Sequence, residues 1–197
     1  MINWIIITVI GYLLGAIPFG VLMGKLYKTD IRQHGSGNIG FTNVWRVLGI
    51  APAAIVLAGD FAKGYWATWL GFYFLGEAGA LWGGVMALLG HTASCFIGFK
   101  GGKGIATGAG IIGFMSPLTL LICLIIVAII TLTTKYMSLG TITAAVLVPV
   151  LLYLFHKPFL YVSGITIACL YVVYRHRSNI KRLLNGTENK IGKTKES

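Results

Sequence analysis

The sequence has few charged residues and very few acidic ones. Charged residues make up 11% of its 197 residues, whereas a soluble domain carries about 25%. Only five residues are acidic, so a metal site built from carboxylates is not expected. The three cysteines stand singly in apolar runs, without the spacing of a zinc site or a redox pair. With 56% hydrophobic residues and a mean hydropathy of +0.82, the sequence predicts an integral membrane protein.

The hydrophobic residues form long continuous runs rather than alternating ones, which favours helices over a barrel. The first run, Ile2–Gly24, is long enough to cross a hydrocarbon core of about 30 Å. It lacks the basic start and small-residue exit of a cleavable signal peptide, so we expect it to remain as the first crossing. The predicted fold is an all-α integral membrane protein of about seven transmembrane helices. Several are short, one segment is re-entrant or interfacial, and residues 1–197 form one domain.

The basic residues gather in short segments between the apolar runs. In the seven-crossing prediction, 15 of the 16 Lys and Arg residues fall on one side, Lys157 being the exception. By the positive-inside rule, that side is the cytoplasm, the N-terminus is outside and the C-terminus is inside. The same clustering accounts for the net charge of +11, so no nucleic-acid partner is expected. A version with five longer crossings is the alternative.

The second apolar run carries two charges, Asp60 and Lys63, within the segment DFAKG. One helix over residues 48–75 would place both near the bilayer centre, at a cost of about 2.5–3.5 kcal/mol each. We therefore expect residues 48–59 to form a short re-entrant or interfacial segment, with a crossing that starts at Gly64. Asp60 and Lys63 would then pair at the cytoplasmic face.

The stretch GSGNIG, residues 35–40, matches the G-x-G-x-x-G pattern of dinucleotide-binding turns. No strand precedes it and no acidic residue follows at the ribose-binding distance, so the dinucleotide interpretation is excluded. Glycine-rich backbone also exposes successive N–H groups, which favours an anion-binding nest. Hydrogen-bonding side chains and a guanidinium suited to phosphate follow in GSGNIGFTNVWR: Ser36, Asn38, Thr42, Asn43 and Arg46.

A second glycine-rich loop is GFKGGKGIATG, residues 98–108. It is not a Walker loop, because Ile97 and Gly104 stand where that motif needs glycine and a hydroxyl residue. Two lysines, Lys100 and Lys103, remain among glycines just before a predicted helix start, where cations, N–H groups and the helix dipole would converge. The sequence predicts a second site for phosphate here.

A histidine-based catalytic motif is absent from the expected places. His91 lacks the acidic partner of an H-x-x-x-x-D pair, because Phe96 stands five residues on. Near the C-terminus, His176, Asn179 and Arg182 fall on one face of a predicted helix, which could close over the two loops.

Together these segments resemble the bacterial acyl-phosphate:glycerol-3-phosphate acyltransferases, the PlsY type. The resemblance rests on GSGNIGFTNVWR, DFAKG, GHTASCFIGFKGGKGIATG, SLG and HRSNIKRLLNGTENK, in the order of that family and over nearly the whole chain. Phe41 replaces the usual alanine, and Ala93 and Ser94 replace the usual Phe-Pro after His91.

The resemblance implies a multi-pass enzyme of the bacterial cell membrane with its site facing the cytoplasm. The enzyme transfers a fatty acyl group from acyl phosphate to the 1-hydroxyl of glycerol 3-phosphate, giving lysophosphatidic acid and phosphate. The expected partners are glycerol 3-phosphate, fatty acyl phosphate and membrane lipid, with no cofactor and no metal. Because acyl phosphate is already activated, no covalent nucleophile is needed, and either a histidine or the donor phosphate acts as base.

The expected catalytic residues are Ser36, Arg46, Lys103, His176 and Asn179. The expected phosphate-binding or substrate-binding residues are Gly37, Asn38, Gly40, Thr42, Asn43, Lys63, His91, Lys100, Gly101, Gly102, Gly104 and Ser138. Two other hypotheses fit a basic membrane protein: a small organic-phosphate transporter, which inverted repeats would favour, and a structural scaffold at the membrane surface. No such repeat is readable.

Overall fold

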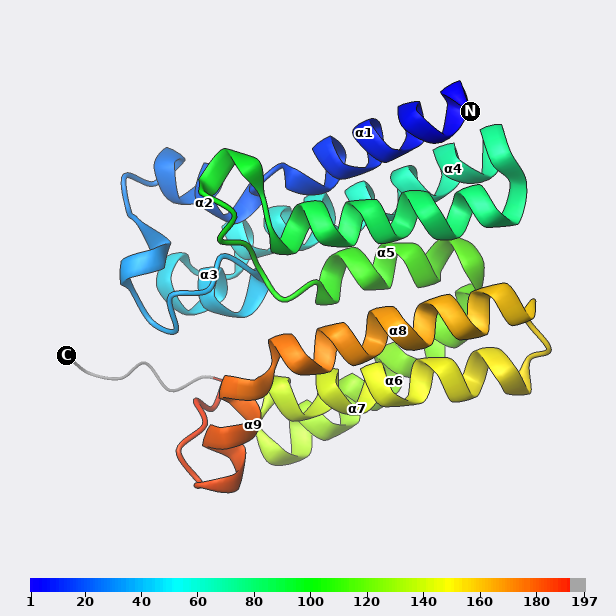
Figure 1. Cartoon of the computed structure of the whole chain (residues 1–197). Helices are drawn as coiled ribbons and strands as arrows, with labels where there is room; N and C mark the ends of the chain where they lie inside the picture. The colour runs from blue at the N-terminus through cyan, green and yellow to red at the C-terminus, as the bar shows by residue number, and fades with distance from the viewer. Residues whose placement is uncertain (192–197) are drawn as a thin grey trace. The chain divides into compact units, whose positions relative to one another are not determined.

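The computed structural model describes residues 1–191, and all regular structure in this range is helical. The described chain groups into two compact units, the first covering Met1–Met115 and the second starting at Ser116. The first unit contains α1 (Ile2–Ala16), α2 (Phe19–Leu26), η1 (Ile31–Gln33), α3 (Phe41–Leu48), α4 (Ile50–Thr92), η2 (Cys95–Ile97) and α5 (Ile105–Met115) (Figure 1). The second contains α6 (Pro117–Thr134), α7 (Met137–Leu154), α8 (Phe159–Arg175) and α9 (Arg177–Leu184).

Two helices, α1 and α2, divide the predicted first crossing between them. The break falls at Ile17 and Pro18, because proline lacks the N–H that would continue the ladder of α1. The last carbonyls of α1 are satisfied from elsewhere: Ser94 Oγ donates to Ala16 O at 2.6 Å and Lys63 Nζ donates to Ile17 O at 3.0 Å. The ends of helices need such partners when they are buried.

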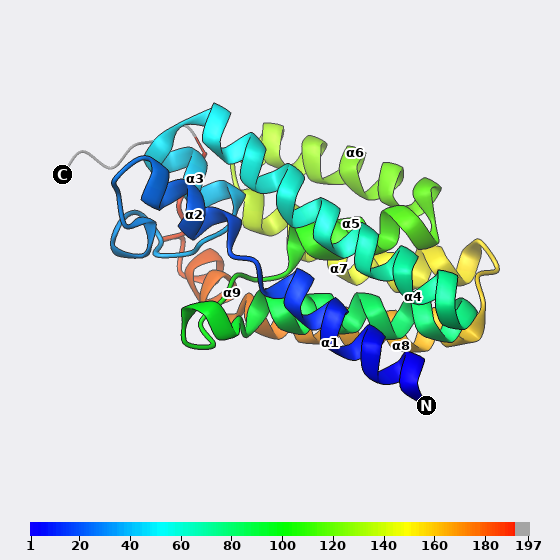
Figure 2. The same ribbon diagram turned by 90° about the horizontal axis from the view of Figure 1, so that it is seen from above.

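Helix α4 is a hairpin of two helical arms. Gly76 has φ 63° and ψ −151°, a backbone conformation open to glycine alone, and the chain reverses there. The arms, residues 50–75 and 77–92, approach so closely that a Cβ on Gly71 would overlap the carbonyl oxygen of Gly79. Figures 1 and 2 show α1 lying along this hairpin, and α1 and α4 are in contact. Small residues allow this close packing of membrane helices.

The expected helix break before Gly64 is wrong. The first arm of α4 runs without interruption from Ile50 to the Gly76 turn, so residues 48–59 are not a separate re-entrant segment. The unfavourable burial of Asp60 and Lys63 is offset because the two charges pair inside the unit. The continuous helix, which we considered too costly for two separate charges, is therefore the structure that forms.

The second unit is built around three apolar helices, α6, α7 and α8, with α9 bent from α8 by 56° at His176 (Figure 1). Pro117 stands at the first turn of α6, where its missing N–H costs nothing. The outward residues of α6 are apolar, and Leu121, Ile125 and Ile129 are each more than half exposed. Such a continuous apolar face at helical spacing is suited to lipid and not to water.

By length and composition, four helical segments of the described chain can cross a membrane, or five if α8 and α9 count as one span. The four are Ile2–Leu26, Ile50–Ile97, Pro117–Thr134 and Met137–Leu154. Counting the arms of α4 separately and adding α1 and α5–α8 gives seven apolar helical rods among residues 1–191, several of them short. The predicted all-α membrane fold is confirmed, and the single-domain expectation stays a prediction.

Candidate active site

The side chain of Asn43 stabilises the conformation of the first glycine-rich loop. This side chain is 1% exposed and reaches back from the first turn of α3. Its Oδ1 accepts the backbone N–H of Ser36 at 2.8 Å, and its Nδ2 donates to the carbonyls of Ile31 at 3.0 Å and His34 at 3.1 Å. Asn43 was expected to bind substrate, but its amide is engaged in folding the loop.

Ser36 and Arg46 both contact the side-chain amide of Asn43. The guanidinium NH1 of Arg46 lies 3.5 Å from Asn43 Oδ1, the atom that accepts the Ser36 N–H. In the same loop, Asn38 Oδ1 accepts the N–H of Gly40, which precedes α3 without a side-chain cap. Gly37 is also in this loop, and Thr42 lies in the first turn of α3. The N–H groups of Ser36, Gly37 and Gly40 are hydrogen-bonded within this segment, and the assignment of the loop to phosphate stays a prediction.

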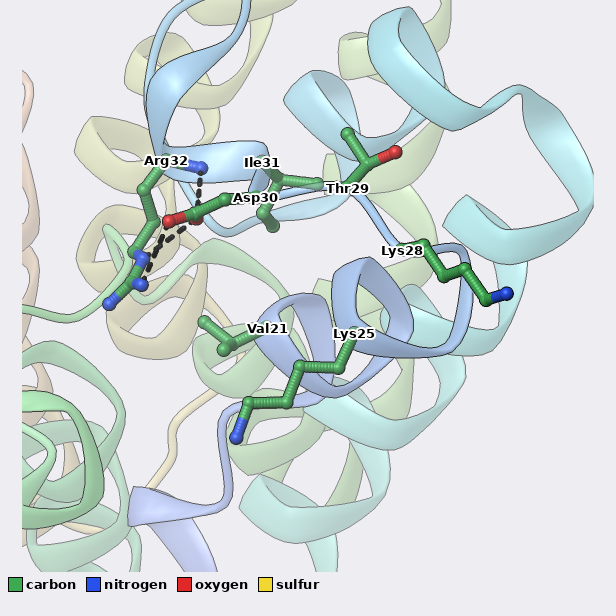
Figure 3. Close-up of a pocket in the computed structure, with 7 residues that line it drawn as sticks. All are labelled: Val21, Lys25, Lys28, Thr29, Asp30, Ile31 and Arg32. Carbon is green, nitrogen blue, oxygen red and sulfur yellow. Dashed lines mark hydrogen bonds and ion pairs between the residues drawn. The ribbon is translucent and has the colours of Figure 1, made fainter.

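A cation-lined pocket of about 350 Å³ lies where the chain enters this loop. Figure 3 shows Lys25 and Arg32 pointing to one side of it and Lys28 pointing away. Asp30 fixes Arg32 through bonds of 2.9 Å from both Nε and NH2. These Arg32 hydrogen bonds lower the pKa of Asp30 to about 2. The ion pair orders η1, three residues before Ser36. Sequence analysis assigned these cations only to the positive-inside pattern.

Three ionisable side chains, Asp60, Lys63 and His91, form a buried cluster in the first unit. Lys63 Nζ lies 2.7 Å from Asp60 Oδ1, and His91 Nδ1 lies 3.6 Å from the same oxygen. All three residues are at most 4% exposed. Lys63 and His91 are both enclosed in this cluster, and their expected binding of phosphate stays a prediction. The predicted Asp60–Lys63 pair is confirmed, and it is buried.

The second glycine-rich loop is attached to the end of α4. Gly101 N–H donates to Thr92 O and Gly102 N–H donates to His91 O, each at 3.1 Å. A Cβ on Gly102 would overlap the His91 Nε2, so the loop backbone lies directly against the imidazole ring. Gly104 follows and α5 begins at Ile105, as predicted, with Lys103 half-buried and Lys100 exposed.

The two glycine-rich loops lie at the same end of the first unit. Ile97, just before the second loop, packs against a hydrophobic cluster that includes Ile39 from the first loop and Ile31 and Val44 from either side of it. Both ribbon views place α2, α3 and the loop before α5 at this end (Figures 1 and 2). The two cationic, glycine-rich loops thus lie at one end of the first unit.

In the second unit, Glu188 joins several candidate residues. Its Oε1 accepts bonds from Ser138 Oγ at 2.9 Å and Asn179 Nδ2 at 2.7 Å, and its Oε2 accepts from Arg182 Nε at 2.7 Å. The Glu188 side chain is 6% exposed. Sequence analysis missed Glu188, although it is one of only five acidic residues.

His176 is buried where α8 meets α9, and its Nδ1 lies 2.8 Å from Val172 O. A carbonyl only accepts hydrogen bonds, so the Nδ1 that faces Val172 O is the donor in this contact. Among residues 1–191, no group of three or more His, Cys, Asp or Glu side chains is arranged to hold a metal ion.

The chain is similar to a set of bacterial acyltransferases over nearly its full length. Residues 5–186 match the family described as glycerol-3-phosphate acyltransferase. The chain is 40% identical over 187 residues to the glycerol-3-phosphate acyltransferase of Bacillus subtilis, covering 94% of this chain and 96% of that protein. It is 45% identical over 190 residues to that of Fusobacterium nucleatum, covering 93% and 95%.

Two solved structures show the same fold. The crystal structure of PlsY, an integral membrane glycerol 3-phosphate acyltransferase, in its glycerol 3-phosphate form matches with a TM-score of 0.93 at 36% identity and covers 96% of both chains. The lysophosphatidic acid form of PlsY matches with a TM-score of 0.90 at 35% identity, over 96% of this chain and 95% of that one.

Proposed function

The chain belongs to the glycerol-3-phosphate acyltransferase family, and we propose that it acylates the 1-hydroxyl of glycerol 3-phosphate with a fatty acyl phosphate. The products are lysophosphatidic acid and inorganic phosphate. The reaction takes place in the bacterial cell membrane, at a site that faces the cytoplasm. The observation that carries the proposal is the convergence of the two glycine-rich loops at one end of the first unit.

The reaction balances without a cofactor. The hydroxyl oxygen of glycerol 3-phosphate attacks the carbonyl carbon of the acyl phosphate, and the bond from that carbon to the phosphate oxygen breaks. The hydroxyl proton goes to a base, and phosphate departs with the bonding electrons. A mixed anhydride is already activated, so the protein must align the two substrates and stabilise the developing charge.

The first unit supplies the groups for phosphate. Arg46 offers a planar guanidinium and Lys103 offers a point charge. Ser36 adds a hydroxyl group on the backbone of the first loop. Asn43 fixes the positions of Ser36 and Arg46 relative to one another through one oxygen atom. Lys100, which is exposed, is assigned to the second phosphate. A charge that binds the leaving phosphate more strongly as the bond breaks raises turnover and not only affinity.

The second unit supplies groups that suit hydroxyls. The imidazole of His176 can exchange a proton with a glycerol hydroxyl. The amide of Asn179 has both a donor and an acceptor end, and its Nδ2 donates to Glu188 Oε1. We assign both residues to orienting glycerol 3-phosphate. The base is either His176 or the donor phosphate, and a bell-shaped or single-limbed pH profile of kcat distinguishes them.

The experiment is product formation by the purified protein in detergent. Palmitoyl phosphate and glycerol 3-phosphate are supplied, and lysophosphatidic acid is measured by mass spectrometry. Glycerol without its phosphate is the matched acceptor control, and we expect no product from it. Absence of lysophosphatidic acid from a folded, monodisperse preparation would contradict the proposed function.

A further inference from the structure

The Asp60–Lys63–His91 cluster lies too deep to touch a substrate in this structure. Each of its residues is between 2% and 4% exposed. A buried ion pair is weak evidence for stability, because desolvating two charges can cost as much as their attraction returns. The contacts of the cluster therefore indicate a role other than stabilisation.

The contacts of the cluster lead to the second glycine-rich loop. Asp60 Oδ1 faces Lys63 Nζ at 2.7 Å and His91 Nδ1 at 3.6 Å, so one carboxylate locates both side chains. The opposite nitrogen of the His91 ring, Nε2, lies where a Cβ on Gly102 would be. The backbone N–H of Gly102 also donates a hydrogen bond to His91 O. Gly102 immediately precedes Lys103.

Lys63 extends the same cluster to the end of α1. Its Nζ donates to Ile17 O at 3.0 Å, at the break between α1 and α2. The cluster therefore joins both arms of α4 to the end of α1 on one side and to the second loop on the other. A group that ties these segments together is suited to fixing the direction of Lys103.

We propose that Asp60, Lys63 and His91 are positioning residues for Lys103, acting through the contact between the His91 ring and Gly102. Asp60 and Lys63 hold the ring in place, and the ring forms the surface against which Gly102 lies. This inference rests on the proposed function, in which Lys103 binds a substrate phosphate. It replaces the expectation that Lys63 and His91 bind phosphate themselves.

A double-mutant cycle between His91 and Gly102 tests the contact. Gly102→Ala adds a methyl group that overlaps the ring, while His91→Ala removes the ring. In the double variant the methyl group has space. Gly108→Ala is the matched control, because a Cβ there meets nothing within 4 Å and Gly108 lies in α5, beyond residues 98–104, the part of this stretch assigned to phosphate.

We expect kcat/KM to fall by roughly tenfold or more in Gly102→Ala and in His91→Ala, since displacing a catalytic group by about 1 Å costs up to roughly 100-fold. Gly108→Ala retains wild-type kcat/KM. The double variant exceeds the value expected from multiplying the two single effects by a factor of roughly 2 or more, which is the lower limit for coupled residues in contact. Effects that simply multiply in the double variant would overturn the inference.

His91→Gln separates positioning from mere stability. It keeps a polar side chain of similar reach beside Asp60, so we expect kcat/KM between those of His91→Ala and the wild type. Should Gly102→Ala not yield folded protein, folded His91→Ala with wild-type kcat and KM would by itself overturn the inference. If the wild type and Gly108→Ala form no product, the proposed function has failed. If they form product and coupling is absent, only the positioning inference has failed.

Discussion

Asn43 Oδ1 lies 2.8 Å from the backbone N of Ser36 and 3.5 Å from NH1 of Arg46, so one buried oxygen locates two of the residues assigned to phosphate. Seven residues separate Asn43 from Ser36, and α3 begins between them. The anion-binding geometry of the first loop thus depends on a side chain that does not contact the substrate in our proposal.

Replacing Asn43 with alanine should therefore impair catalysis and folding together. Three hydrogen bonds from the amide to backbone groups are lost. The Ser36 N–H loses its acceptor, whereas the carbonyls of Ile31 and His34 each keep one backbone N–H donor. We expect a loss of about 1–3 kcal/mol in stability for unsatisfied buried groups. Activity and the thermal midpoint are measured, with the exposed Asn185→Ala as control. Wild-type activity in Asn43→Ala would show that the loop does not need this amide.

Removing either proposed phosphate cation should cost activity while leaving the fold intact. Arg46→Ala and Lys103→Ala each remove a charge-assisted contact worth about 1.5–3 kcal/mol, or about one to two decades in rate. Arg46→Lys should also be impaired if two guanidinium nitrogens bind one phosphate. Steady-state kinetics with each substrate varied provides the measurement, and Lys157→Ala provides the control. Near-normal turnover in both alanine variants would rule out this assignment.

The Asp30–Arg32 pair should give stability a defined pH dependence. The folded pKa of Asp30 is lowered to about 2 by the Arg32 hydrogen bonds, whereas an unfolded aspartate has a pKa of about 3.9. A lowered folded pKa stabilises the fold fully above the unfolded value, and this contribution disappears as the pH falls through about 2. The midpoint difference between wild type and Asp30→Asn should shrink over this range. A difference that grows toward acid would have the wrong sign.

The proposed membrane orientation rests on the basic residues, of which the seven-crossing prediction places 15 of 16 in the cytoplasm. In a variant without native cysteines, Gln33→Cys should react with a membrane-impermeant thiol reagent only after cells are opened. Lys157→Cys should react from outside intact cells. The reverse labelling pattern would contradict the orientation and the cytoplasmic site.

Much of the fold was predictable because hydropathy reports on lipid exposure. The long apolar helices and the helix start after Gly104 follow from local composition. The pairing inside the membrane did not follow, since the sequence does not show that His91 and Ile17 would supply partners for Asp60 and Lys63. Both partners are distant in sequence.

Some features of the candidate site were likewise predictable from the sequence, and others were not. The glycine-rich stretches at residues 35–40 and 98–104 were identifiable from spacing and charge. The functions of Asn43 and Glu188 were not, because each depends on contacts that form only after folding. From sequence alone, an asparagine within a glycine-rich loop motif is interpreted as a substrate-binding residue. Only the folded structure shows that backbone groups engage its amide.

The choice of acyl donor tests the central claim most directly. Rates with palmitoyl phosphate and palmitoyl-CoA are compared side by side with the purified protein and glycerol 3-phosphate. An acyl phosphate places its anion next to the reacting carbonyl, where Lys103 and Arg46 can stabilise the departing phosphate. A thioester has no phosphate at that place, and the sequence lacks an H-x-x-x-x-D pair at His91. We expect lysophosphatidic acid from palmitoyl phosphate and little from palmitoyl-CoA. Comparable rates from both donors would contradict the claim that the glycine-rich loops bind the phosphate that leaves.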